Sequence, residues 1–183
     1  GASGFSSVTG LLQTKPSDDR LSPQDANEIV EACVKMAEVK TGALIVIERN
    51  VSMGDIVSAS GVAVDAVISS QLLINIFEDK TPLHDGAVII RDNRVAAASC
   101  ILPVTQSEIG QELGTRHRAA VGASEVSDAF IIVVSEETGK ISIARDGKLE
   151  KAVSEAVFRQ ELLNLCEKTA PAGAKAINKI WRG

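Results

Sequence analysis

A run of five apolar residues, Ala43-Leu44-Ile45-Val46-Ile47, predicts a strand that is buried on both of its faces. A second run of this kind, Phe130-Ile131-Ile132-Val133-Val134, lies much further along the chain, and Ala87-Val88-Ile89-Ile90 lies between the two. Strands with no alternating polar face belong to sheets that helices cover on both sides. Because helical segments alternate with strands early and hairpins follow, we predict an α/β domain with a mixed central β-sheet flanked by helices.

Helical spacing and capping residues mark the first two helices. Ser22-Pro23 predicts a helix start, apolar spacing continues the helix to Val39, and Gly42 is expected to end it. Asp65 is expected to cap a second helix, which Thr81-Pro82 terminates. The rest of the chain predicts strands at 87–90, 95–102, 130–134 and 141–143, a short helix at 107–113, and further helices at 116–124 and 153–166.

The composition narrows the range of partners. The chain has 183 residues, a formal net charge of −5, 3% aromatic residues and no tyrosine. A general nucleic-acid binder presents a basic face, and a single-strand binder needs aromatic stacking platforms, so the composition argues against a nucleic-acid partner. An anion site on this acidic chain must be a local basic cluster, which suits a small phosphorylated ligand.

The length suits one domain, which we expect over residues 21–168. Residues 1–20 are polar and are expected to be a flexible lead-in with a tag remnant at Gly1-Ala2-Ser3, and residues 169–183 are expected to be a C-terminal tail. The three cysteines are widely spaced, which indicates reduced thiols in a cytosolic protein. No apolar run approaches the roughly 20 residues of a membrane span.

The first candidate site is Leu83-His84-Asp85-Gly86-Ala87, at the mouth of an apolar strand. The Asp85 carboxylate can bind a divalent metal or polarise a hydroxyl, and it gains most with a metal because a free carboxylate is a weak base. Gly86 has no Cβ, so a ribose or phosphate can approach the backbone. His84 can ligate a metal through a neutral imidazole. Asp-Gly is also a common turn, and a lone histidine is more often structural.

The second candidate site is Gly114-Thr115-Arg116-His117-Arg118, at a predicted helix start. Thr115 is expected to be the N-cap, and the first N–H groups of a helix attract anions. Arg116 and Arg118 carry planar guanidiniums that bind phosphate in a bidentate manner, and His117 adds a donor. A solvated basic turn is the weaker interpretation, because helix starts prefer acids and these cations repel one another.

A third segment, Ser135-Glu136-Glu137, follows the strand at 130–134. Neighbouring acids at a strand end commonly form a solvated turn, but ligands of α/β proteins bind at such ends, so a metal or ribose contact is the other interpretation. The sequence contains no GxxxxGK(S/T) phosphate loop, no GxGxxG motif after a strand and no nucleophile elbow.

The ordered pair of Asp85-Gly86-Ala87 and Thr115-Arg116-His117-Arg118, with Ser135-Glu136-Glu137 downstream, resembles the diadenylate cyclase domain over about residues 22–150. The sequence Pro82-Leu83-His84-Asp85-Gly86-Ala87 is most similar to that of the membrane-tethered branch, whose catalytic domain follows transmembrane helices. The resemblance implies a cytoplasmic domain of a membrane-anchored protein, at the inner face of a bacterial cell membrane.

This family converts two ATP into the second messenger cyclic di-AMP and two pyrophosphates, with Mg²⁺, Mn²⁺ or Co²⁺. The resemblance therefore implies a nucleotidyltransferase in which a ribose 3′-hydroxyl attacks an α-phosphorus in line. The implied catalytic residues are Asp85, Arg116, His117 and Arg118; the implied substrate-binding residues are Gly86, Ala87, Leu102 (through its backbone), Thr115, Arg116, His117, Arg118, Ser135 and Glu136; and the implied metal ligands are His84, Asp85 and Glu137. Relatives often carry an aromatic residue where this chain has Ile101, so adenine stacking is not expected here.

The product ring is symmetric, and two copies of one half-site across a two-fold axis can make it, so we expect a homodimer to be needed for catalysis. Two alternatives remain open at this stage. One is a sensor that binds ATP or cyclic di-AMP without turnover, which would have no need of the Asp85 carboxylate. The other is a nucleotidyltransferase with a different acceptor, which product analysis would distinguish.

Overall fold

The computed structural model describes residues 21–167, so the predicted lead-in at 1–20 and tail at 169–183 lie outside the described residues. The strands are β1 (Ala43–Ile47), β2 (Val62–Val67), β3 (Ala87–Arg91), β4 (Arg94–Cys100), β5 (Phe130–Val134), β6 (Ile141–Arg145) and β7 (Lys148–Glu150). The helices are α1 (Pro23–Glu38), α2 (Gly54–Ser60), α3 (Ser70–Phe77), α4 (Thr115–Glu125) and α5 (Glu155–Leu165).

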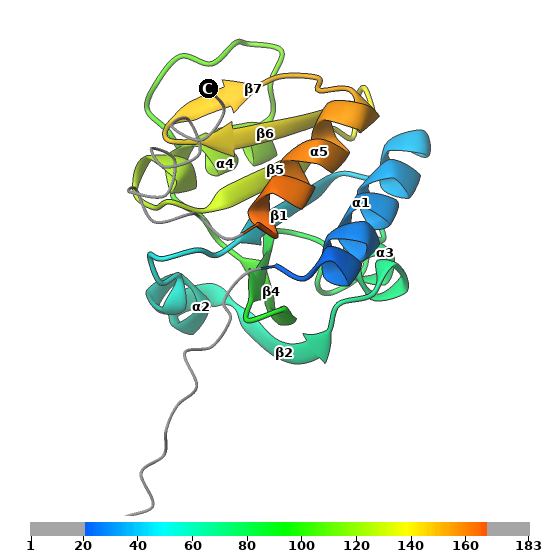
Figure 1. Cartoon of the computed structure of the whole chain (residues 1–183). Helices are drawn as coiled ribbons and strands as arrows, with labels where there is room; N and C mark the ends of the chain where they lie inside the picture. Colours follow the sequence, from blue (N-terminus) through cyan, green and yellow to red (C-terminus); the bar gives the residue numbers. More distant parts are fainter. Residues whose placement is uncertain (1–20, 168–183) are drawn as a thin grey trace, which may run out of the picture.

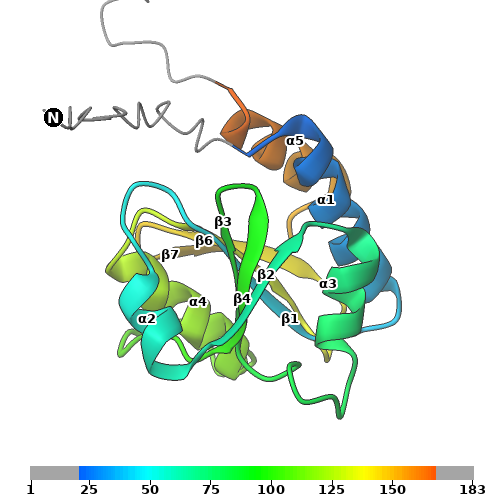
Figure 2. The ribbon, with the colours of Figure 1, turned by 90° about the horizontal axis from the view of Figure 1, so that it is seen from below.

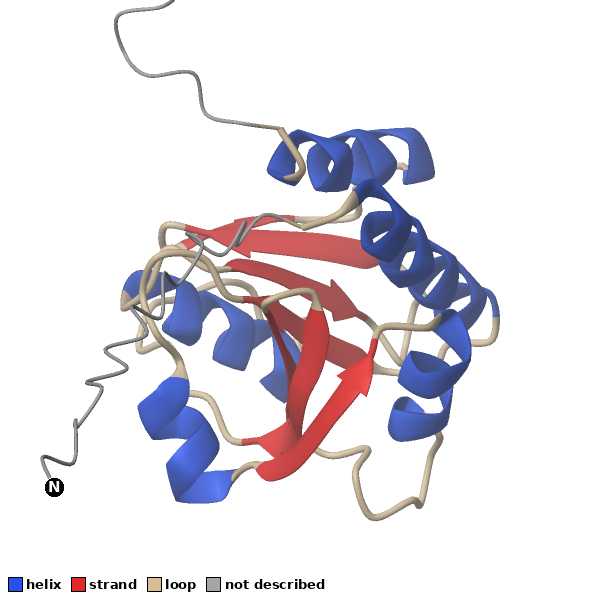
Figure 3. Ribbon diagram, turned by 60° about the horizontal axis from the view of Figure 1, so that its bottom comes forward, coloured by secondary structure: helices blue, strands red, loops and turns tan. Residues whose placement is uncertain are grey.

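The seven strands form one sheet in the order β2-β4-β3-β1-β5-β6-β7 (Figure 1). Strands β1 and β3 are parallel, and every other neighbouring pair is antiparallel. Helices α1, α3 and α5 cover one face of this sheet, and α2 and α4 cover the other (Figures 2 and 3). The prediction of an α/β domain with a mixed, helix-covered sheet is confirmed.

Strand β1 lies in the middle of the sheet and contributes to two separate cores. Ile45 and Ile47 pack into the core that contains α1, α3 and α5. Leu44 and Val46 pack into the core on the side of α4. All five residues of β1 are buried, as an unbroken apolar run requires. Burial of each large side chain contributes about 1.5–3 kcal/mol to the free energy of unfolding.

The strand registers bring several strand ends to one edge of the sheet. Ala43 at the start of β1 lies opposite Val134 at the end of β5, and Ala87 at the start of β3 lies opposite Cys100 at the end of β4. Since β1 and β3 run in parallel, both starts lie at the same edge. We call this end of the sheet, where the strand ends and their loops meet, the Ala43 edge; it is not one of the outermost strands. The segments before β1 and β3 and those after β4 and β5 therefore lie side by side along it.

Helix α1 begins as predicted but ends differently. The Ser22 Oγ accepts a hydrogen bond from the amide of Asp25 at 3.1 Å, and Pro23 occupies the first turn. Lys40 takes the left-handed conformation after the helix, with φ of 55°, and Gly42 does not. The expectation that Gly42 ends the helix is therefore wrong. Gly42 instead lies directly before β1, at the Ala43 edge.

The predicted helix start at Asp65 is also wrong, because this residue lies within β2. Asp65 has φ of 48°, and the register between β2 and β4 shifts around it. Its carboxylate accepts a hydrogen bond from Arg94 Nε at 2.6 Å, which holds this bulge against β4. The helix begins later, at α3, where Ser69 is the N-cap and accepts from the amide of Leu72.

The short helix predicted at 107–113 does not form. This segment is a loop with a turn in which the Leu113 amide donates to the Gly110 carbonyl at 3.3 Å. Gly110 has φ of 117°, which a helix does not allow. The patterns used above do not predict α2 or β7, which are short.

Cys33, Cys100 and Cys166 are free thiols, in line with the expectation from their spacing. Burial raises the pKa of the Cys33 thiol to about 12, so this cysteine stays protonated and unreactive at neutral pH. Across residues 21–167, no helix combines the length and the apolar character that crossing a lipid bilayer requires.

We expect Gly122→Ala to lower the free energy of unfolding by about 1–3 kcal/mol, because α4 has no room for a methyl group there. A Cβ on Gly122 would lie 2.7 Å from the amide nitrogen of Thr105, and closer still to the carbonyl oxygen of Pro103. This clash outweighs the gain of about 1 kcal/mol that alanine brings to a helix. Urea denaturation measures the difference.

The matched control is Gly114→Ala at the start of the same helix, where an added Cβ meets nothing within 4 Å. We expect this change to cost less than about 1 kcal/mol. Equal losses in the two variants would contradict the assignment of a tight contact at Gly122.

Candidate active site

The segment before β3 reaches the Ala43 edge in a conformation that only glycine adopts easily. Gly86 has φ of 89°, and a Cβ there would lie 2.7 Å from the carbonyl oxygen of Cys100. This close approach lets Ala87, which is fully buried, enter the sheet directly after the turn. Asp85 stands just outside, with 86% of its side chain exposed at the edge. Its carboxylate is therefore open to a ligand.

The neighbouring His84 is oriented by a backbone carbonyl. Its Nδ1 lies 2.6 Å from the carbonyl oxygen of Thr81, which can only accept, so Nδ1 carries a proton. The other ring nitrogen, Nε2, lies 3.3 Å from the Asp85 carboxylate and 3.8 Å from that of Asp79. His84 and Asp85 therefore face one another as a pair of potential ligands.

The N-terminus of α4 lies at the same edge, on the face of the sheet opposite to α1, α3 and α5. Gly114 is the N-cap and Thr115 the first helical residue, so the expectation that Thr115 caps the helix is wrong. No side chain caps this end, which leaves its N–H groups available to an anion. The Arg116 guanidinium lies over Gly42, where a Cβ would come within 2.6 Å of its Cζ. Gly42 thus provides the space that Arg116 occupies.

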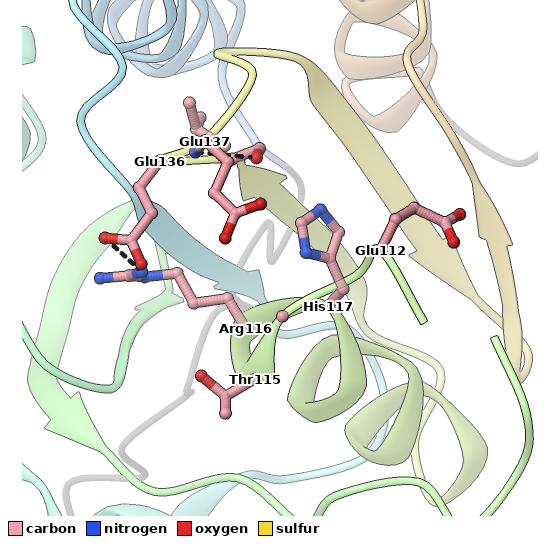
Figure 4. Close-up of a pocket in the computed structure, with 9 residues that line it drawn as sticks. Glu112, Thr115, Arg116, His117, Glu136 and Glu137 are labelled. Carbon is pink, nitrogen blue, oxygen red and sulfur yellow. Dashed lines mark hydrogen bonds and ion pairs between the residues drawn. The ribbon is translucent and has the colours of Figure 1, made fainter. Parts of the chain in front are cut away.

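A small pocket forms where this helix tip meets the end of β5 (Figure 4). It has a volume of about 40 Å³. Arg116 Nη1 pairs with Glu136 Oε2 at 3.4 Å on one side, and Glu137 points between Arg116 and His117 (Figure 4). The pocket is lined by Glu112, Gly114, Thr115, Arg116, His117, Val134, Ser135, Glu136 and Glu137.

His117 is the most buried polar side chain of this pocket, with 6% of the residue exposed. Burial is the main cause that lowers the pKa of its imidazole, and the positive charges of Arg116 and Lys151 lower it further. The carboxylate of Glu137 opposes this shift only in part. The ring is therefore neutral at pH 7, where it offers one donor and one acceptor.

Besides Gly86 and Ala87 at the start of β3, the predicted substrate-binding residues Arg118 and Leu102 lie outside this pocket. Arg118 Nη2 donates to the Gly110 carbonyl at 3.4 Å, so this arginine holds the 107–113 loop. The Leu102 side chain is buried in the core beside α4, which leaves only its backbone at the Ala43 edge. Next to it, Ile101 is 74% exposed. The exposed Ile101 therefore offers an apolar surface where related proteins often carry an aromatic residue.

The structure thus gathers Thr115, Arg116, His117, Ser135, Glu136 and Glu137 into one pocket, while Asp85 and Gly86 lie apart from it at the start of β3. Since β1 separates β3 from β5, the two groups are about two strand spacings, or roughly 10 Å, apart. Within residues 21–167, no group of three or more His, Cys, Asp or Glu side chains is arranged to hold a metal.

Sequence reasoning missed two residues of this arrangement. Glu112 lines the pocket, but it lies in a segment predicted to be helical and belongs to no motif. Gly42 makes room for Arg116, and the sequence pattern suggested a helix end instead. Only its place directly before the buried run of β1 could have indicated a role at a strand start.

Comparison with known proteins assigns the chain to a family. Residues 30–149, more than half of the chain, match the model of the DAC family, described as DisA bacterial checkpoint controller nucleotide-binding. The chain therefore belongs to the DAC family. It is 47% identical over 156 residues to the cyclic di-AMP synthase CdaA of Bacillus subtilis strain 168. The match covers 85% of this chain but only 56% of that relative.

Solved structures are also similar to this chain, and two of them illustrate the match. A crystal structure of DacA from Staphylococcus aureus matches with a TM-score of 0.77 and 45% identity, over 79% of this chain and 97% of that one. A crystal structure of a hypothetical membrane spanning protein from Bacillus cereus matches with a TM-score of 0.66 and 44% identity, over 72% of this chain and 64% of that one.

The buried His117 predicts how stability depends on pH. Its pKa is lowered in the folded protein, whereas the unfolded chain has an imidazole with a pKa of about 6.5. As the pH falls below 6.5, the unfolded state takes up the proton first, so the free energy of unfolding decreases. Urea denaturation between pH 7.5 and 5 should show a smaller decrease in His117→Gln than in the unmodified protein.

The comparison of His117→Gln with the unmodified protein contains its own control, because every titrating group other than His117 is present in both. Only the difference between the two pH profiles reports on His117. Parallel profiles over this range would show that its imidazole is not held neutral by the fold.

Proposed function

We propose that this chain is a diadenylate cyclase domain, which condenses two ATP into cyclic di-AMP and releases two pyrophosphates. Each 3′-hydroxyl attacks the α-phosphorus of the other nucleotide, so two P–O bonds form, two bonds to pyrophosphate break and each hydroxyl loses its proton. Membership of the DAC family and the 47% identity to a cyclic di-AMP synthase support this activity.

One observation carries the proposal: an open carboxylate and a cationic helix tip share one edge of the sheet. Asp85 stands exposed before β3, and Arg116 lies over Gly42 before β1. A nucleotide along this edge would meet Gly86 and the backbone of Leu102 with its nucleoside, and Arg116 with its phosphates. Asp85 would then be near the ribose, where it can polarise the 3′-hydroxyl.

The phosphate side of the proposed site combines several weak binders. The uncapped N–H groups of α4 attract the phosphate charge, and Thr115 and Ser135 add hydroxyls. The Arg116 guanidinium can exchange the exposed carboxylate of Glu136 for a phosphate oxygen. The neutral imidazole of His117 can donate one hydrogen bond without adding charge. Arg118 would act on this site mainly by fixing the loop that carries Glu112.

We further propose that the site uses Mg²⁺, Mn²⁺ or Co²⁺. Such ions are commonly held by one or two carboxylates together with the phosphates of the substrate, so a closed cage of protein ligands is not needed. His84 and Asp85 face one another at 3.3 Å and fit this role on the ribose side, and Glu137 fits it on the phosphate side. A bound ion would neutralise charge that develops on the reacting phosphate and lower the pKa of the attacking hydroxyl.

The size of the pocket supports a site completed by a second subunit. Small-molecule sites usually enclose about 300–1,000 Å³, far more than the roughly 40 Å³ of this pocket. One chain therefore encloses only a phosphate-sized part of the nucleotide and leaves the rest open. Two chains that face each other across a two-fold axis would enclose both nucleotides and place each 3′-hydroxyl near the other α-phosphorus.

We propose that the domain works at the inner face of a cell membrane, as part of a membrane-anchored protein. The support is indirect: one similar structure is described as a membrane spanning protein. ATP, the proposed substrate, is plentiful on the cytoplasmic side.

Asp85→Asn should abolish most of the cyclase activity while ATP binding is largely kept. The amide cannot accept a proton or hold a metal as a carboxylate does, so we expect a loss of about 10²-fold or more. The measurement is chromatography of the products formed from ATP and Mn²⁺. The matched control is Asp79→Asn, which removes the same charge at 3.8 Å from His84 but lies outside the Asp85-Gly86-Ala87 motif, and which should stay close to full activity.

This experiment also separates the cyclase from the other two functions. A sensor would bind ATP equally well in both variants and form no product in any of them. Another nucleotidyltransferase would leave ATP unchanged until its acceptor is added. A product ring formed equally fast by Asp85→Asn would exclude the role given to this carboxylate.

Catalysis by a symmetric dimer should depend steeply on protein concentration. Below the dissociation constant of the dimer, the rate of ring formation should rise with about the square of protein concentration, because two chains must meet. ATP binding per chain should stay constant over the same range. Initial rates and sedimentation measured on the same dilution series provide the test. A rate strictly proportional to protein concentration in samples that sediment as monomers would refute the dimer requirement.

A further inference from the structure

We infer that Lys151 is a further phosphate ligand of this site, which contacts the terminal phosphates of the nucleotide and is held by Glu112 in their absence. The inference rests on the proposed function, because it presumes a nucleotide at the Ala43 edge. No motif in the sequence singles out either residue.

The strand registers place Lys151 at the same edge as the pocket. Strand β7 runs antiparallel to β6 with Glu150 opposite Ile143, so the chain that leaves β7 moves toward the start of β6. There the amide of Val153 donates to the carbonyl of Ile141 at 2.9 Å. Ile141 in turn lies opposite Val134, which lines the pocket. Lys151 therefore comes to the edge two strands beyond β5.

Lys151 is tied directly to a residue of the pocket wall. Its Nζ lies 3.4 Å from Oε1 of Glu112, which lines the pocket on the side away from Glu136 (Figure 4). The Lys151 side chain is 48% exposed and that of Glu112 is 68% exposed. Ion pairs this exposed contribute little to stability, so a phosphate can replace the carboxylate at little cost. Once released from Glu112, the half-exposed ammonium can turn toward an anion that enters the pocket.

The charge of the pocket calls for another cation. Three carboxylates line it against one guanidinium, and the imidazole of His117 is neutral. A triphosphate would meet repulsion from Glu112, Glu136 and Glu137 unless positive charge from elsewhere offsets it. Lys151 supplies such charge, because its ammonium lies 3.4 Å from the carboxylate of Glu112, which lines the pocket.

The order of the strands indicates which part of the nucleotide Lys151 meets. Along the edge, Leu102 follows β4 and Gly86 precedes β3, and these positions belong to the nucleoside in the proposed function. Gly42 with Arg116 comes next at β1, then Ser135 after β5, then Lys151 after β7. Lys151 lies furthest from the nucleoside end, so its partners are the β- and γ-phosphates, which leave as pyrophosphate.

The test is calorimetric binding to the full chain of three probes: an ATP analogue with a methylene group between the α- and β-phosphates, inorganic pyrophosphate, and AMP. We expect Lys151→Gln to weaken binding of the ATP analogue and of pyrophosphate about five- to tenfold, as loss of one partly exposed charged hydrogen bond predicts. Binding of AMP should change less than twofold. Lys151→Arg should keep most of the affinity for all three probes.

The matched control is Lys148→Gln, which removes the same charge from the other end of β7. Lys148 lies opposite Arg145, at the edge of the sheet away from the pocket. It should leave all three affinities within twofold of the unmodified protein. Equal weakening by both variants would mean that only net charge matters, and it would overturn the inference, as would equal weakening of AMP and pyrophosphate by Lys151→Gln.

The outcomes separate this inference from the proposed function. If the unmodified protein forms cyclic di-AMP and Lys151→Gln binds pyrophosphate and the ATP analogue normally, Lys151 is no phosphate ligand and the cyclase stands. If the unmodified protein forms no cyclic di-AMP but Lys151→Gln loses polyphosphate binding selectively, the cyclase fails and Lys151 remains a ligand of a polyphosphate site.

Discussion

The pairing of β1 between β3 and β5 is the constraint on which the rest of the structure depends. β1 is buried on both faces, so its side chains join two cores, and its neighbours fix which loops can meet. Parallel pairing with β3 brings the Asp85-Gly86 turn to the Ala43 edge, and antiparallel pairing with β5 brings Ser135 there. A slip of one residue in either register would turn every buried side chain of the slipped strand to the opposite face. The position of the site is therefore fixed by the same packing that stabilises the fold.

The electrostatics of the site follow from its place at this edge. In the proposed function, the helix tip and Arg116 would attract phosphate, and the three carboxylates beside them would weaken the binding of a bare anion. Binding in the proposed site would then depend on cations that arrive with the ligand or, as inferred for Lys151, move toward it. Glu136 and Glu112 are each paired with a basic side chain across exposed contacts, so both pairs can open without a large loss of stability.

The sequence predicted the fold class and most of the central strands, because unbroken apolar runs such as Phe130–Val134 have few alternatives to a buried strand. It failed at Asp65, where pairing of β2 with β4 and a hydrogen bond from Arg94 outweigh a helical pattern of apolar residues. Motifs identified the residues of the pocket that carry unusual chemistry, such as Arg116 and His117. They could not identify Glu112, whose place depends on a loop and on strand registers that no local pattern encodes.

The two outermost strands of the sheet differ from the others in a way that affects how chains meet. β7 is only three residues long, and β2 is interrupted by the bulge at Asp65, whose carboxylate stands exposed. Edge strands that are short, bulged or charged resist the edge-to-edge pairing of sheets that leads to aggregation. The proposed dimer would therefore form through loops and side chains rather than through a sheet shared by the two copies.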